Sequence, residues 1–150
     1  MKIMQSLLLS TLVFSATAQA DDDVTYRKDI RPLWEEHCMA CHGESSPHLA
    51  EFKHNKKMYM EKSQGPRMAS YGELVTYVGW PDSGALMRRL DDGKNANGKP
   101  GNMYEYLGEN EADRQKNLAV FKAWVGEGGW VLKRFKDLSK DELSMMKVKE

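Results

Sequence analysis

The chain has 150 residues with 22 basic and 22 acidic side chains, so its formal net charge is zero, and 41% of its residues are hydrophobic. This length suits a single domain that can bury a core of its own. The balanced charge gives no indication of a nucleic-acid partner.

Residues 1–20 have the pattern of an export signal. Lys2 precedes an apolar run over residues 7–14, and Ala18-Gln19-Ala20 is typical of a signal-peptidase site. The apolar run is too short for a transmembrane helix, and no later segment reaches the required length. We therefore expect cleavage after Ala20, a periplasmic location and no membrane span in the mature chain.

Residues 21–43 are predicted to form an acidic lead followed by a helix. Asp29 is the expected N-cap, and Pro32 is tolerated because its missing N–H has no acceptor in the first turns of a helix. Trp34 lies on the face that is expected to turn towards the core, and Gly43 ends the helix.

The end of this helix carries the motif Cys38-Met39-Ala40-Cys41-His42, whose C-x-x-C-H spacing is typical of covalent haem c attachment. Two thiols three positions apart lie on one side of a helical turn, where both can form thioethers with one haem. The histidine that follows is then placed to bind the iron from one face. The motif predicts Cys38 and Cys41 as attachment points and His42 as an iron ligand.

Three other uses of the same residues are weaker interpretations. A thioredoxin-like dithiol needs a βαβ pattern around the motif, but the surrounding sequence is helical. A disulfide is sterically awkward across this spacing in a helix. A structural zinc site needs four ligands, so the two cysteines would have to recruit two of the four histidines, His37, His42, His48 and His54.

The middle of the chain has shorter patterns. Residues 44–69 are expected to form a loop that leads into one irregular helix. Its lysines are interpreted as a solvated face, the alternative being that they dock an acidic redox partner together with Arg67. Ser70 then caps a short amphipathic helix that Gly79 closes. The next short helix is expected to turn Leu86, Met87 and Leu90 inward and Arg88 and Arg89 outward.

A glycine-rich loop over residues 93–102 leads to Met103. Such a lead lets the backbone approach a porphyrin face closely, and a thioether is a soft ligand that suits iron opposite a histidine. Because the chain has ten methionines, a core role is the alternative interpretation, and the competing ligands are Met58, Met60, Met68 and Met87. Met103 is preferred because a long helix follows it directly.

That last helix is capped by Asn110 and ends at Gly126, with one apolar stripe formed by Leu118, Phe121, Trp124 and Val125. A second capping box, from Ser139 to Glu142, lies further on. We therefore expect a cleaved signal peptide at residues 1–20 and one domain at residues 21–129. Residues 130–150 are expected to form a carboxy-terminal extension packed on the same domain.

Together these residues make the chain resemble a class I c-type cytochrome over most of its length up to about Gly129. The resemblance implies an all-α fold, a cytochrome c-like bundle of short helices around one covalently bound haem, with contact between the first and last helices. It implies Cys38 and Cys41 as thioether positions, His42 as proximal ligand and Met103 as distal ligand. It also implies Trp34 in the helix contact, with Phe121 or Trp124 as its partner.

The chain departs from that family in three places before Gly129, and the tail after Gly129 lies outside the usual pattern. Ile30 stands where the family often has a glycine, and Tyr104 follows Met103 where a proline is usual. The proline whose carbonyl accepts from the proximal imidazole usually lies further along than the nearest candidate here, Pro47.

The resemblance implies a single-haem carrier that passes one electron between redox proteins by Fe(II)/Fe(III) cycling, without catalysis of its own. One alternative is a haem enzyme or gas sensor with an open sixth site, for which His54 and Arg67 are the candidate acid–base groups. Another is the haem subunit of a larger periplasmic oxidoreductase.

Overall fold

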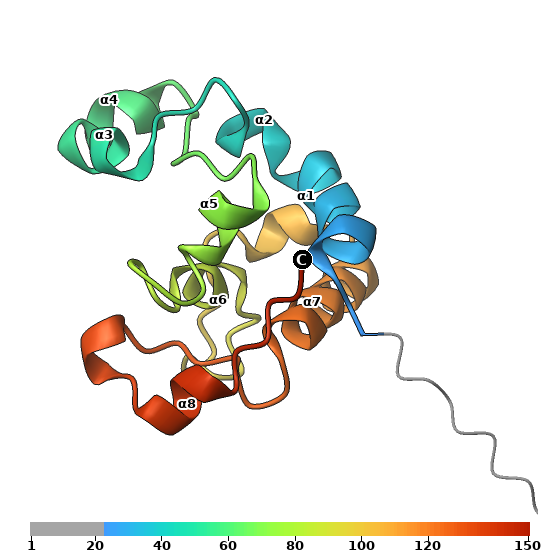
Figure 1. Cartoon of the computed structure of the whole chain (residues 1–150). Helices are drawn as coiled ribbons and strands as arrows, with labels where there is room; N and C mark the ends of the chain where they lie inside the picture. The colour runs from blue at the N-terminus through green and yellow to red at the C-terminus, as the bar shows by residue number, and fades with distance from the viewer. Residues whose placement is uncertain (1–22) are drawn as a thin grey trace, which may run out of the picture.

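The structure is a computed structural model that describes residues 23–150, so the predicted signal peptide lies outside the described residues. Every regular element in residues 23–150 is helical, which confirms the predicted all-α class (Figure 1). In chain order the elements are η1 (Tyr26–Ile30), α1 (Arg31–His37), α2 (Met39–His42), α3 (Leu49–His54), α4 (Lys56–Glu61), α5 (Tyr71–Val75), α6 (Ala85–Leu90), η2 (Tyr104–Leu107), α7 (Glu111–Val125), η3 (Phe135–Asp137) and α8 (Lys140–Ser144).

The first helical segment begins earlier than predicted. Thr25 is the N-cap, its hydroxyl accepting from the amide of Lys28, while Asp29 accepts from the amide of Thr25 at 2.8 Å. The expected cap at Asp29 is therefore wrong, and Asp29 instead completes the cap from inside the helix. The first turn, η1, is a π-helix, in keeping with Pro32, whose ring crowds the carbonyl of residue 28 and offers that carbonyl no N–H.

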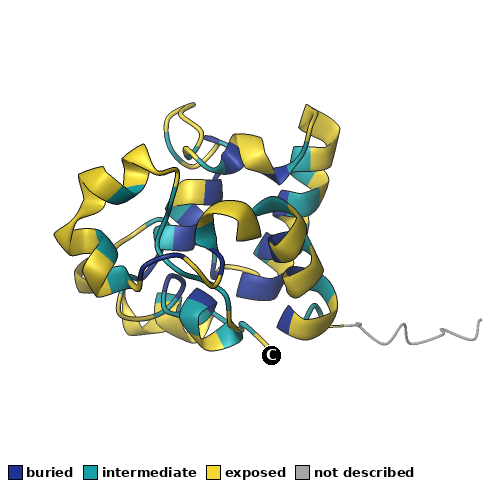
Figure 2. Ribbon diagram, turned by 90° about the horizontal axis from the view of Figure 1, so that it is seen from above, coloured by how far each residue is buried: buried dark blue, intermediate teal, exposed yellow. Residues whose placement is uncertain are grey.

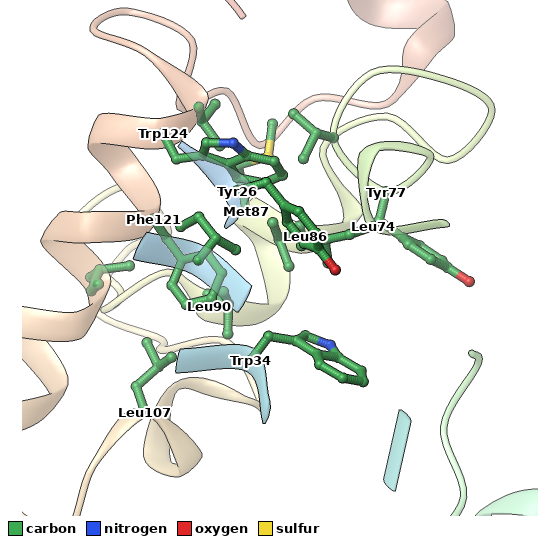
Figure 3. Packing of buried hydrophobic residues seen from close by; sticks show 14 of the residues in the cluster. Tyr26, Trp34, Leu74, Tyr77, Leu86, Met87, Leu90, Leu107, Phe121 and Trp124 are labelled. Carbon is green, nitrogen blue, oxygen red and sulfur yellow. The ribbon is translucent and has the colours of Figure 1, made fainter. Parts of the chain in front are cut away.

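Much of the core forms where α7 packs against η1 and η2. The stripe predicted on α7 is buried, and Asn110 caps the helix by accepting from the amide of Asp113 at 3.0 Å, as expected. The aromatic pair at the crossing is Tyr26 with Trp124, whose ring centroids lie 6.4 Å apart. Figure 3 shows Trp34 at the edge of this cluster, with Phe121 and Leu107 to one side of it.

The segment predicted as a loop and one irregular helix contains two short helices, α3 and α4, which pack on each other and lie apart from α7 and α8 (Figure 1). Their outer faces are exposed, whereas the buried residues of the chain gather where the other helices face one another (Figure 2). Ser70 caps α5 as expected, accepting from the amide of Glu73 at 3.2 Å.

The carboxy-terminal segment returns across the crossing of η1 and α7. The amides of Lys147 and Val148 donate to carbonyls at the end of α7, and Lys149 accepts from both the Tyr26 amide and the Trp124 indole at 2.8 Å. Among residues 23–150, none of the helices has the length and apolar character that crossing a membrane requires.

Candidate haem-binding site

The two cysteines lie on one helical turn, as their spacing predicts. Cys38 stands between α1 and α2, and its carbonyl accepts from the amides of Cys41 at 3.2 Å and His42 at 3.0 Å. Both thiols are free; Cys41 is exposed and Cys38 half-buried. Burial, with a smaller effect of neighbouring Cys41, raises the pKa of Cys38 to about 12, so this thiol is protonated at neutral pH.

The His42 imidazole is fixed by one nitrogen. Its Nδ1 lies 2.7 Å from the carbonyl oxygen of Pro66, a distance at which Nδ1–H donates to that oxygen and Nε2 keeps its lone pair. Burial lowers the pKa of His42, although the bond to Pro66 acts in the opposite direction. The ring is therefore held neutral in the tautomer that can bind a metal through Nε2.

The segment Gly65-Pro66-Arg67-Met68 is paired with the motif through its backbone. Gly65 donates to the carbonyl of Cys41 at 2.7 Å, and Met68 donates to the carbonyl of His42 at 2.9 Å. A Cβ atom at Gly65 would stand 2.1 Å from Cε1 of the His42 ring, so only glycine lets the segment lie this close to the imidazole.

This arrangement corrects the sequence-based candidate for the imidazole's acceptor. The carbonyl of Pro47 accepts from the backbone amide of Arg67 at 2.8 Å, whereas the imidazole bonds to Pro66. Pro66 was not among the acceptors predicted from the sequence. The signal that could have found it is the Gly65-Pro66 pair, which is typical of a turn.

The candidate acid–base groups of an enzyme do not form a site together. Arg67 is held in ion pairs with Glu44 and, at 3.1 Å, with Glu73. His54 is exposed at the end of α3. Within residues 23–150, no cluster of three or more His, Cys, Asp or Glu side chains could hold a metal ion, which argues against the zinc interpretation.

Met103 is half-buried, packs against the core and lies directly before η2. Its amide donates to the carbonyl of Arg89 at 2.9 Å, so the segment runs beside the end of α6. Gly101 is needed for this approach, since a Cβ there would lie 2.2 Å from the Arg89 carbonyl oxygen. The glycine-rich segment thus lets the backbone lie close to α6. From the sequence, the same segment was predicted to lie close to a porphyrin face.

The competing methionines stand in different surroundings. Met58 and Met60 are exposed on α4, at 39% and 60% of their surface, and Met87 is fully buried on α6. Met68 belongs to the same segment as Pro66, and its amide donates to the backbone carbonyl of His42.

One buried polar atom tests whether the surroundings suit a haem. Trp34 is 4% exposed, one helical turn before Cys38, and its indole Nε1 has no hydrogen-bond partner among the described residues. A buried N–H without an acceptor is costly, and it marks a place where a bound group with acceptor atoms is expected. This orphaned donor, the free thiols and the neutral imidazole fit a covalently bound haem.

Comparisons with known proteins agree with this chemistry. A family model described as PccH Cytochrome c matches residues 25–150. A solved structure described as monoheme cytochrome PccH from Geobacter sulfurreducens is 53% identical, with a TM-score of 0.79 over 85% of this chain and 99% of that chain. No curated protein sequence matches significantly. The chain therefore belongs to the PccH cytochrome c family and is a single-haem electron-transfer protein with one covalently attached haem c.

Proposed function

We propose that the chain is a periplasmic carrier whose haem is attached through Cys38 and Cys41 and whose iron is bound by His42 and Met103. The observation that carries this proposal is the 2.7 Å contact between Nδ1 of His42 and Pro66, which leaves Nε2 of a neutral ring for the iron. The bound haem supplies one-electron exchange between Fe(II) and Fe(III).

The protein residues set the conditions for that exchange. Pro66 orients the imidazole and makes it a better electron donor. The thioether of Met103 would bind the iron opposite His42, favour the reduced state and leave no position for a substrate. The surroundings of Met58, Met60, Met68 and Met87 support Met103 as this ligand.

The partners in this proposal are redox proteins that meet the carrier through a small, transient interface. Lys99 is exposed in the loop before Met103 and is free to steer an acidic partner, whereas Lys94 lies 2.9 Å from Asp92. Residues 21–129 form the carrier domain, and residues 130–150 are an extension of it.

Mass analysis of the exported protein tests the attachment and the location. We expect a periplasmic chain that starts at Asp21 and carries one haem, whose proteolytic haem-bearing peptide contains residues 38–42. Replacing both cysteines with serine should abolish the added mass. A protein that retains residues 1–20 in the cytoplasm, or a chain whose haem is released by denaturation, would contradict the proposal.

A further inference from the structure

The loop that ends at Met103 is closed at its base by backbone contacts. Just before the loop, the carbonyl of Asp91 accepts from the amide of Gly101 at 2.8 Å, and the carbonyl of Arg89 accepts from the amide of Met103 at 2.9 Å. The position of Met103 therefore depends on where the end of α6 and Asp91 are held.

Asp91 is a buried carboxylate, 1% exposed, with both oxygens occupied. Its Oδ2 accepts from the amide of Gly93 at 3.0 Å. Its Oδ1 accepts from the side-chain amide of Asn95 and from the indole Nε1 of Trp130, both at 3.0 Å. Two of these three partners, Gly93 and Asn95, lie within the loop, and the third, Trp130, belongs to the carboxy-terminal extension.

The extension is itself fixed around Trp130. Lys122 of α7 lies over the indole ring, with Nζ 5.6 Å from the centroid. Arg88 was predicted to face outward, but its guanidinium donates at 3.0 Å to the carbonyls of Leu132 and Lys133. Since Arg88 lies on α6, the extension holds α6 at two points, the guanidinium and the carboxylate of Asp91.

We propose that the contact between Trp130 and Asp91 is a positioning contact through which the carboxy-terminal extension holds Met103 on the iron. This inference rests on the proposed function, because it takes Met103 as the distal ligand. Without the indole N–H, the carboxylate keeps its bonds within the loop but loses its link to the extension. The loop then opens more readily, and a competing ligand displaces Met103 more easily.

The test is a titration of the ferric holoprotein with imidazole, followed by loss of the weak far-red band of sulfur-to-iron ligation. Trp130→Phe removes the indole N–H and leaves a ring under Lys122. The matched control is Trp124→Phe, which removes an indole bond of 2.8 Å to Lys149 at the other end of the extension. Met103→Ala is the reference for a missing ligand, and carbon monoxide binding to the ferrous proteins is the second readout.

We expect the apparent Kd for imidazole to fall by about fivefold or more in Trp130→Phe, the size expected for one lost hydrogen bond, and to stay unchanged in Trp124→Phe. Equal Kd values in the two variants would overturn the inference and leave the proposed function intact. A wild type without the far-red band, or a band that persists in Met103→Ala, would overturn the ligand assignment itself.

Discussion

Nδ1 of His42 lies 2.7 Å from the carbonyl oxygen of Pro66, a contact that joins residues 24 positions apart in the chain. Through this bond a backbone group outside the C-x-x-C-H motif sets the tautomer and the electron-donating strength of the proposed proximal ligand. The bond depends on Gly65, where a side chain would overlap the ring.

Replacing Gly65 with alanine should therefore weaken the bond between His42 and Pro66. A less polarised imidazole donates less charge to ferric iron, so we expect the reduction potential to rise, on the order of tens of millivolts. The measurement is a spectroelectrochemical titration. Gly72→Ala is the matched control, because a Cβ there meets nothing within 4 Å. Equal potentials in both variants would show that the segment moves aside without loosening the bond.

Trp34→Phe tests whether the orphaned indole donor of Trp34 acquires an acceptor in the holoprotein. If the bound haem accepts from Nε1, the phenylalanine variant should lose about 1 kcal/mol of stability against unfolding. Denaturant unfolding of the holoproteins measures this difference, with Trp124→Phe as a comparison that loses a known hydrogen bond to Lys149. A Trp34→Phe protein as stable as wild type would mean that the N–H stays without an acceptor.

The lowered pKa of Asp92 predicts that the stability of the fold depends on pH. Burial alone would raise its pKa, but hydrogen bonds from the side chain and amide of Lys94 and from Gln115 hold the pKa at about 2, below its ordinary value of 3.8. A depressed pKa adds stability above pH 4, on the order of 1–2 kcal/mol, and this contribution disappears as the pH falls towards 2.

Asp92→Asn should thus be less stable than wild type at pH 6, and the difference should shrink between pH 4 and pH 2. Thermal unfolding of both holoproteins across this range measures it. A difference that stays constant with pH would show that the charge of Asp92 contributes nothing.

Local patterns in the sequence predicted much of this structure. The spacing of the C-x-x-C-H motif fixes two thiols on one turn, and the cap at Asn110 and the stripe on α7 depend on residues three or four positions apart. Such relationships are visible in the sequence because a helix brings near neighbours together.

The remaining contacts join distant segments and leave no periodic signal. Pro66 meets His42 across 24 residues, and Trp130 meets Asp91 across 39 residues. Arg88 was predicted to face outward because it is charged, but its guanidinium donates to carbonyls of the carboxy-terminal extension. The cap at Asp29 was wrong by one turn, because Pro32 allowed a widened π-turn that begins after Thr25.

The most direct test of His42 and Met103 as the two iron ligands is the visible spectrum of the holoprotein, oxidised and reduced, with carbon monoxide added, for wild type, Met103→Ala and Met68→Ala. We predict that wild type and Met68→Ala show the far-red band of sulfur-to-iron ligation and resist carbon monoxide, and that Met103→Ala loses both properties. A wild type that is high-spin or binds carbon monoxide readily would contradict the His42/Met103 carrier and indicate an open sixth site.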